Sequence, residues 1–145
     1  MTANLSKLNE FMKTGNYAKA EFYLYEFLQS NPNDYTLNKN LGMTLLAQKK
    51  YDGALTSFEK CYFLNKEDFD TVLNLSFLFL RVQDHEQSIR FAEEALAIDA
   101  KASGALQNLA TCYLEMKDFD KASHFAEKVI ELRGGITSKV FLQYE

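Results

Sequence analysis

The chain has 145 residues, of which 47% are hydrophobic and 25% are charged, a balance that excludes an intrinsically disordered protein and suits a folded domain. Lysine and arginine number 16 against 20 aspartates and glutamates, and this net charge of −4, without basic clusters, excludes a nucleic-acid partner. The most apolar stretch, residues 72–82, is much shorter than the ~18–20 residues that a membrane-spanning helix needs, so we expect no membrane insertion.

Apolar residues recur every three or four positions in eight consecutive segments, which predicts eight α-helices. Asn16, Asp84 and Asp118 stand just before three of these segments, where a side-chain oxygen can cap free backbone amides, whereas Lys50 in the same place is a poor cap. Gly15 is expected to end the first helix, and residues 31–34 (Asn-Pro-Asn-Asp) separate the second helix from the third. The expected helices are residues 3–14, 17–30, 35–48, 51–64, 69–82, 85–98, 103–116 and 119–132.

The eight segments form four pairs. The pairs align with one another when the sequence is shifted by a constant number of residues, which is the separation of Leu41 from Leu75 and of Leu75 from Leu109. The alignment needs no insertion from Ala20 to Leu132. Small residues in fixed columns let two antiparallel helices approach closely, and large residues are expected to fill the gaps between pairs. A single pair cannot bury its apolar face alone, so the sequence predicts four repeats stacked in one all-α domain, an α-solenoid. The repeats are residues 1–34, 35–68, 69–102 and 103–136; a column of small residues holds Ala20, Ala54, Ser88 and Ala122, and the expected gap-filling residues are Tyr51, Phe58, Phe79, Tyr113 and Phe119.

The period and the residues of the second repeat resemble the tetratricopeptide repeat (TPR) family over residues 1–136. The matching residues are Asn40, Leu41, Gly42, Leu45, Tyr51, Ala54 and Phe58. The first repeat is the weakest match, because Lys7 and Leu8 replace the usual Leu-Gly, and Lys66, Ala100 and Gly134 replace the usual proline between repeats. The resemblance implies a right-handed superhelix whose first helices line a concave groove. It implies protein binding and no particular reaction.

An asparagine directly precedes the repeating leucine in three repeats, at Asn40, Asn74 and Asn108. Because the first helices line the groove in TPR proteins, these amides are expected to form a ladder that bonds the backbone of an extended peptide. The alternative is that each amide bonds a neighbouring helix and has a structural role only.

Neighbouring columns of the same helices are expected to select side chains of the peptide. They hold Lys39, Leu73 and Gln107, then Met43, Phe77 and Thr111, with Arg81 further along the third repeat. Leu73 and Phe77 lie four residues apart, so they either form an exposed apolar contact site or pack under a neighbouring helix. A clamp for a terminal carboxylate is not expected, because the cationic column holds Leu73 and Gln107 in two of three repeats.

The sequence contains no motif of an enzyme and no spacing of metal ligands, so we expect neither catalysis nor a cofactor. His85 stands in a column that is aromatic elsewhere and is therefore interpreted as a core residue. Cys61 and Cys112 stand in buried columns and are expected to be reduced and inert, and no signal peptide is visible, so a cytoplasmic location is predicted. The predicted function is a scaffold that binds a partner protein or peptide. The alternatives are the substrate-recognition arm of a larger glycosyltransferase or sulfotransferase, and a chaperone for secreted proteins.

Three aromatic residues, Phe22, Tyr25 and Phe63, stand on helix faces that are otherwise polar. Such patches occur in isologous dimers, so they predict a homodimer, although isolated surface aromatics are also common.

Residues 137–145 follow Gly134 and Gly135 and contain Val140, Phe141 and Tyr144 at helical spacing. We expect the start of a helix that caps the fourth repeat by docking on Tyr113 and Val129. Because two turns are short for that task, the sequence also favours a longer natural protein, of which this chain is the N-terminal part.

Overall fold

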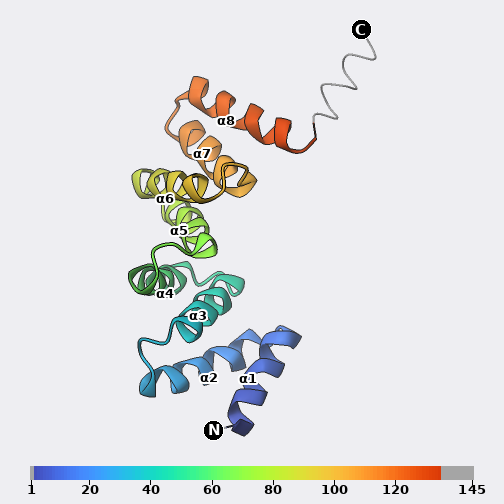
Figure 1. Ribbon diagram of the computed structural model, residues 1–145, viewed down its shortest axis with the longest axis vertical. Helices are drawn as coiled ribbons and strands as arrows, with labels where there is room; N and C mark the ends of the chain where they lie inside the picture. The colour runs from blue at the N-terminus through green and yellow to red at the C-terminus, as the bar shows by residue number, and fades with distance from the viewer. Residues whose placement is uncertain (1, 135–145) are drawn as a thin grey trace. The chain divides into compact units, whose positions relative to one another are not determined.

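The computed structural model describes residues 2–134, with side chains from residue 4 onward, and the expected C-terminal helix at 137–145 lies outside the described residues. The described part consists of eight α-helices joined by short turns (Figure 1). Their ends differ from the expected ones by at most one residue. The helices are α1 (Thr2–Thr14), α2 (Tyr17–Ser30), α3 (Tyr35–Ala47), α4 (Tyr51–Leu64), α5 (Phe69–Arg81), α6 (His85–Ile98), α7 (Ser103–Glu115) and α8 (Phe119–Leu132).

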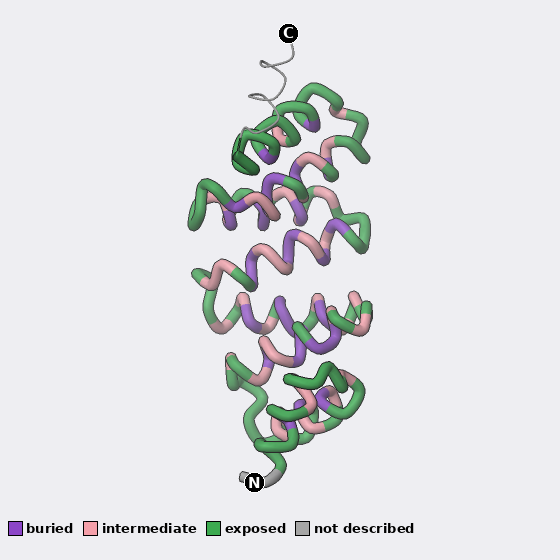
Figure 2. The backbone as a smooth tube through the Cα atoms, turned by 90° about the vertical axis from the view of Figure 1, so that its right-hand side faces the viewer, coloured by how far each residue is buried: buried purple, intermediate pink, exposed green. Residues whose placement is uncertain are grey.

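The helices are divided between two compact units. The N-terminal unit, residues 1–71, contains α1–α4 and the first residues of α5, and the C-terminal unit, residues 72–145, contains the rest of α5 and α6–α8. In each unit a helix packs against the next one along the chain, as α3 does with α4 and α7 with α8. The buried positions follow one face of each helix (Figure 2). The arrangement of all four repeats in a single domain stays a prediction.

The turn inside each repeat has one residue in the left-handed region of backbone conformation. The four residues occupy equivalent positions of the four repeats: Gly15 (φ 75°), Lys49 (61°), Gln83 (66°) and Lys117 (65°). A residue of this conformation commonly ends a helix, and only glycine adopts it without steric cost. The predicted end of the first helix at Gly15 is therefore confirmed, and the other three repeats make the same turn with a strained residue.

The start of the second helix varies between repeats. Asp84 and Asp118 accept hydrogen bonds from the backbone amides three residues later, as predicted. The prediction for Asn16 is wrong, because its side chain makes no capping bond and only its carbonyl oxygen accepts the first helical bond. Lys50 does not cap α4 either, but its Nζ lies 3.0 Å from Oε1 of Glu21 and ties the second repeat to the first.

Three repeats contain a stacked pair of aromatic rings that joins their two helices. The ring centroids are 5.8 Å apart in Phe11–Tyr23, 5.6 Å in Phe79–Phe91 and 5.7 Å in Tyr113–Phe125. The second repeat has Leu45 and Ser57 at these positions and instead brings Gly42 against the ring of Phe58, which is fully buried. Phe58 thus fills the core as expected, whereas the expectation for Phe119 is wrong. Its side chain is 60% exposed, because among the described residues no later helix covers it.

Replacing Lys117 by glycine is expected to stabilise the C-terminal unit by about 0.5–1 kcal/mol, since the left-handed turn then loses its steric strain. Urea denaturation followed by circular dichroism gives the change in the free energy of unfolding. Glu127→Gly is the matched control, because Glu127 is exposed within α8 and glycine there should cost about 1 kcal/mol. Equal destabilisation by both changes would contradict the strained turn.

Candidate functional site

The C-terminal unit contains a cleft of about 400 Å³ between the first helices of its two repeats. The residues of α5 and the following turn form one wall, and those of α7 form the other. Most of these side chains carry an amide, hydroxyl or charged group, and Phe77 and Leu80 supply the apolar part. The lining residues are Phe77, Leu80, Arg81, Gln83, Gln107, Asn108, Thr111 and Glu115.

Two contacts between α5 and α7 hold the two walls of this cleft together. Nδ2 of Asn108 donates a hydrogen bond of 3.2 Å to Oγ of Ser76 on α5. Near the start of the helices, a Cβ atom built on Gly104 would lie 3.4 Å from Cδ1 of Leu73, so Leu73 packs on α7 and is only half exposed. The spacing of the walls is therefore fixed by a polar contact and an apolar one.

Ser76 belongs to a small buried polar network between α5, α6 and α7. Its hydroxyl donates to the carbonyl oxygen of Ser88, and the hydroxyl of Ser88 donates to the carbonyl oxygen of Ser76, at 2.9 and 2.7 Å. Sγ of Cys112 lies 3.2 Å from Oγ of Ser88. Because both serines are fully buried and bonded to each other's backbones, they clamp α5 to α6 and so support the wall that faces Asn108.

Both cysteines are buried free thiols, as predicted. Burial raises the pKa of Cys61 to about 11 and raises the pKa of Cys112 against the opposing effect of its contact with Ser88. A thiol that stays protonated is a poor nucleophile, so these residues have the properties of core side chains.

Glu115 forms the end of the cleft wall and binds His85. Nε2 of His85 lies 2.6 Å from Oε2 of Glu115. The interpretation of His85 as a core residue is therefore corrected: its side chain is 22% exposed and forms a polar contact with the next repeat. An imidazole can occupy an aromatic column, but it also carries a polar nitrogen that needs a partner, which only the tertiary structure supplies.

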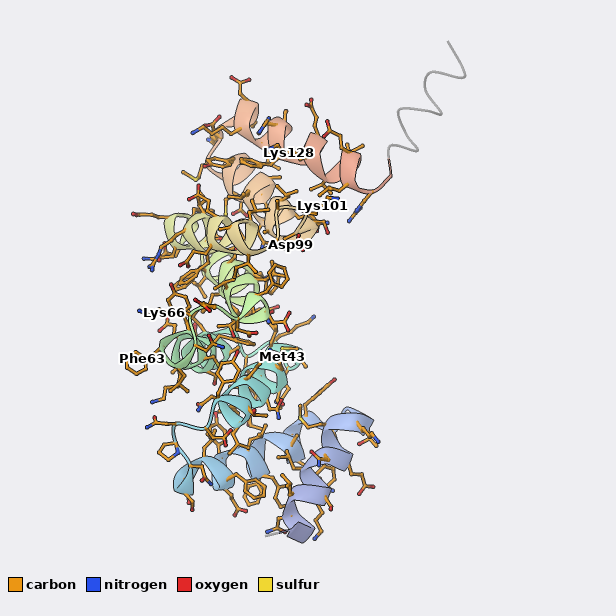
Figure 3. All side chains as sticks on the ribbon, in the orientation of Figure 1. Met43, Phe63, Lys66, Asp99, Lys101 and Lys128 are labelled. Atoms are coloured by element: carbon orange, nitrogen blue, oxygen red, sulfur yellow. The ribbon has the colours of Figure 1, made fainter. Side chains whose placement is uncertain are left out.

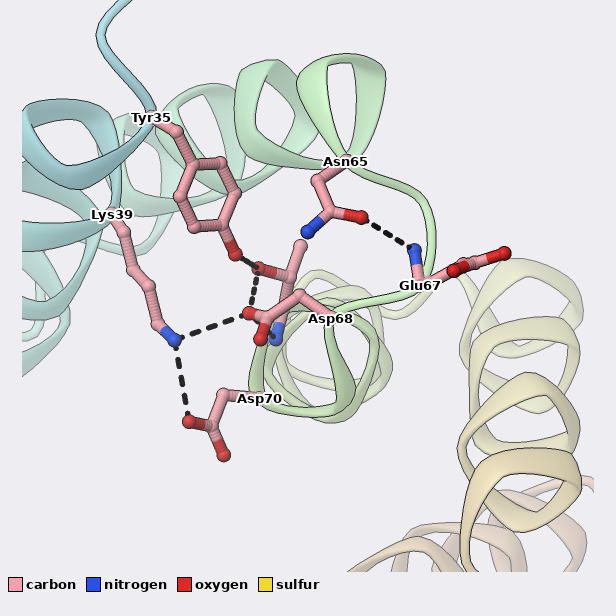
Figure 4. A network of polar contacts seen from close by, with 7 residues as sticks. Tyr35, Lys39, Asn65, Glu67, Asp68 and Asp70 are labelled. Carbon is pink, nitrogen blue, oxygen red and sulfur yellow. Dashed lines mark hydrogen bonds and ion pairs between the residues drawn. The ribbon is translucent and has the colours of Figure 1, made fainter.

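A second polar cluster lies in the N-terminal unit, where α3 meets the beginning of α5 (Figure 4). Nζ of Lys39 lies 3.1 Å from Asp68 and 3.3 Å from Asp70, and the hydroxyl of Thr71 donates a bond of 2.8 Å to Asp68. The hydroxyl of Tyr35 lies 3.2 Å from that of Thr71. Lys39, predicted to contact a peptide, is thus held by two carboxylates of its own chain.

The charges and hydrogen bonds of this cluster shift its pKa values. Burial alone would raise the pKa of Asp68, but the hydrogen bonds from Tyr35, Thr71 and Lys39 lower it to about 2. Burial would lower the pKa of Lys39, but Asp68 and Asp70 raise it. Both shifts favour the charged forms, so the cluster stabilises the N-terminal unit at neutral pH.

The cleft brings together five residues that were proposed from the sequence: Phe77, Arg81, Gln107, Asn108 and Thr111. The residues that line it do not include Leu73 or Asn74. Asn40, Lys39 and Met43 belong to α3 in the N-terminal unit, where Asn40 is half-buried and Met43 is 44% exposed. The three asparagines expected to form the ladder therefore differ in their surroundings. Asn108 bonds Ser76 on the neighbouring helix α5, which is the structural role that the sequence analysis gave as the alternative to peptide binding.

Sequence reasoning missed Leu80, Gln83 and Glu115 in the cleft. Glu115 could have been found, because it lies one repeat period after Arg81 and so occupies the same place on the next first helix. Gln83 lies in the left-handed turn, and no periodic signal marks a turn residue as part of a wall.

The three surface aromatics are exposed as expected: Phe63 by 76%, Phe22 by 59% and Tyr25 by 49%. Figure 3 shows the ring of Phe63 projecting away from α4. Phe22 and Tyr25 lie on α2, so the N-terminal unit carries apolar surface on both of its second helices. Their part in a homodimer stays a prediction.

Among residues 2–134, no three histidine, cysteine, aspartate or glutamate side chains are placed to hold a metal ion. Within the same range, no helix is both long enough and apolar enough to cross a membrane.

Comparison with known proteins decides the family. Tetratricopeptide repeat models match residues 40–62 and 68–134. The chain is a tetratricopeptide repeat protein. Such domains generally mediate protein–protein interactions. No curated protein matches the sequence significantly.

Solved structures confirm the fold of this TPR protein. MamA of AMB-1 matches with a TM-score of 0.84 and 22% identity, over 96% of this chain and 76% of that chain. MamA (41-end) from Desulfovibrio magneticus RS-1 matches with a TM-score of 0.82 and 22% identity, over 90% of this chain and 73% of that chain. A tetratricopeptide repeat protein from Parabacteroides merdae ATCC 43184 has a TM-score of 0.78 and 21% identity, over 90% and 52%. At these identities the likeness establishes an all-α solenoid of helix pairs.

Proposed function

We propose that this TPR protein is a non-enzymatic scaffold that binds an extended segment of a partner protein in the cleft between α5 and α7. The observation that carries the proposal is the composition of the cleft, in which amide and hydroxyl side chains stand beside an apolar strip. An extended peptide presents backbone donors and acceptors at regular intervals and side chains on alternate faces, and the cleft offers complementary groups for both.

Gln107 and Asn108 are the groups best placed to bond a peptide backbone. Among the described residues, the side chain of Gln107 makes no hydrogen bond, so its oxygen and both of its N–H groups are available. Asn108 uses one N–H for Ser76, which orients the amide and leaves its oxygen for a partner. Side chains whose orientation is fixed before binding lose less conformational entropy when the partner arrives.

Phe77 and Leu80 provide the apolar contact for a hydrophobic side chain of the segment. Arg81 and Glu115, at corresponding places on the two helices, give the cleft groups of both charge signs, so it does not favour a strongly acidic or strongly basic segment. We therefore expect a segment of low net charge that contains at least one hydrophobic residue.

The proposal predicts that Gln107→Ala combined with Thr111→Ala weakens peptide binding about 5- to 150-fold, from two lost hydrogen bonds of ~0.5–1.5 kcal/mol each. Peptides selected from a random display library against the intact chain serve as ligands, and isothermal titration calorimetry gives the dissociation constants. Arg90→Ala with Glu93→Ala, on exposed positions of α6, is the matched control and should bind as the parent does. If the α6 variant loses binding and the α7 variant keeps it, the cleft is not the site.

A further inference from the structure

A groove of about 670 Å³ lies between α1 and α2 in the N-terminal unit. Three aromatic rings in contact with one another form its apolar part. Tyr23 stacks on Phe11 with ring centroids 5.8 Å apart, and it makes an edge-to-face contact with Phe22 at 5.5 Å. Phe22 is 59% exposed, so part of this aromatic surface is open to a ligand. The residues that line the groove do not include the other two surface aromatics, Tyr25 and Phe63.

Two lysines stand beside the rings. Lys7 on α1 and Lys19 in the first turn of α2 are both exposed. Nζ of Lys19 lies 5.4 Å from the centre of the Phe11 ring, so its charge is held over the aromatic part of the groove. Within the described part of the chain, neither lysine forms an ion pair, and the acidic lining residue, Glu10, forms none either. Both ammonium groups can therefore pair with a carboxylate of a ligand.

The first repeat differs from the second at the positions around this groove. Lys7 corresponds to Leu41 and Glu10 to Thr44, and these two residues of α3 are 5% and 0% exposed. Burying the charges of Lys7 and Glu10 under a further helix would cost free energy without compensation. The groove therefore suits a ligand that brings charges of its own.

The charge around the groove has the opposite sign to that of the whole chain. Residues 1–20 contain three lysines and one glutamate, whereas the chain has a net charge of −4. Ala18 lines the groove at a position where the first turns of the other second helices have Asp52, Glu86 and Asp120. An acidic ligand is thus attracted to this groove in preference to the rest of the surface.

We propose that the groove is a second binding site, for an acidic segment of a partner protein that also contains an aromatic or large aliphatic side chain. Carboxylates of the segment pair with Lys7 and Lys19, and its apolar side chain packs on the exposed part of Phe22. Exposed ion pairs contribute little by themselves, so the apolar contact supplies much of the affinity and the charges supply selectivity. A membrane surface would require a larger basic cluster, of about four or more lysines or arginines.

The site does not depend on the proposed function of the cleft between α5 and α7, for which we expect a segment of low net charge. Its test uses the intact chain and a short synthetic peptide in which aspartates flank phenylalanines, and isothermal titration calorimetry gives the dissociation constants. The cleft variant Gln107→Ala with Thr111→Ala should bind this peptide as the parent does, so the two sites fail or succeed separately.

Lys7→Gln combined with Lys19→Gln is expected to weaken binding of the acidic peptide about 2- to 30-fold, through the loss of two exposed ion pairs. Lys101→Gln combined with Lys128→Gln is the matched control and should bind as the parent does. It removes the same charge from two exposed lysines of the C-terminal unit, and Lys128 also lies over an aromatic ring, that of Phe125.

Phe22→Thr tests the apolar half of the site, since Thr56 occupies the corresponding position of the second repeat. We expect it to weaken binding about 3- to 20-fold, because a partly exposed ring no longer becomes buried by the ligand. Phe63→Thr is the control, because Phe63 is 76% exposed on α4 and lies outside the groove. Circular dichroism confirms that each variant keeps its helical content.

Replacing the aspartates of the peptide by asparagines should also weaken binding, and added salt should weaken the binding of the acidic peptide. If the neutral peptide binds equally well, or if both lysine variants lose affinity equally, the proposal is overturned. Sedimentation velocity and vesicles of phosphatidylserine test the other occupants. Self-association or vesicle binding that is lost with Lys7→Gln and Lys19→Gln, without binding of the peptide, would assign the groove to a second copy or to a membrane surface and would overturn it as well.

Discussion

Replacing Gly42 by alanine is expected to lower the free energy of unfolding of the N-terminal unit by up to about 2 kcal/mol through overpacking, although alanine favours helix. A Cβ atom on residue 42 would lie 2.8 Å from Cε2 of Phe58 and 3.0 Å from Cδ2 and Cζ of the same ring. Phe58 is fully buried, so its ring can move away only by displacing the side chains packed around it. Overpacking of this kind costs about 1–3 kcal/mol, which exceeds the ~1 kcal/mol gained in helix propensity.

Gly104→Ala provides the matched comparison. It also replaces a glycine within a first helix, but its Cβ would meet Leu73 at an ordinary contact distance of 3.4 Å. This change should stabilise the C-terminal unit by up to about 1 kcal/mol. Urea denaturation of both variants gives the two free energies. Phe58→Leu added to Gly42→Ala should cost less than the sum of the single changes, because the smaller side chain removes the clash. Additive costs, or a stable Gly42→Ala protein, would show that the ring relaxes freely.

Replacing Asp68 by asparagine is expected to remove about 2 kcal/mol of stability from the N-terminal unit at pH 7. The pKa of this carboxyl group falls from 3.8 to about 2 on folding, and each unit of difference corresponds to about 1.4 kcal/mol. Because the folded value is the lower one, the stabilisation is complete above about pH 4 and is lost as the pH falls towards 2. The parent should therefore lose stability in acid through this residue, and the variant should not.

Urea denaturation at pH 7 and at about pH 2.5 measures this difference between parent and variant. We expect it to shrink to less than about 1 kcal/mol at the lower pH, since the carboxyl group is then partly protonated in the folded state. Asp70→Asn is the control, because Asp70 contacts the same Lys39 but its side chain is 64% exposed. An exposed ion pair of this kind should contribute less than about 1 kcal/mol. A pH-independent effect of Asp68→Asn would show that the lost packing, and not the charge, is responsible.

The sequence by itself determined the helices and their repetition. Periodicity alone placed the eight helices of residues 2–134, because a helix with one buried face must repeat its apolar residues every three or four positions. The repeating columns identified the turn positions and the buried small residues, since each repeat buries its face in the same way against its neighbour. Five residues of the cleft between α5 and α7 followed from the same columns, because equivalent residues of successive first helices share one side of the stack.

Only the tertiary structure decided which partner each polar side chain of the repeating columns binds. Asn108 meets Ser76, Lys39 meets Asp68 and Asp70, and His85 meets Glu115. These partners lie far apart in the sequence, and repeat periodicity fixes the position of a side chain without fixing the chemistry of its neighbour on the next helix pair. The exposure of the fourth repeat was equally hidden from the sequence. Leu80 of the third repeat is 8% exposed, whereas Leu114, at the same position of the fourth repeat, is 55% exposed. Exposure of such a column depends on which neighbouring helix packs on it, and this is a property of the stacked pairs that the residues of one repeat do not encode.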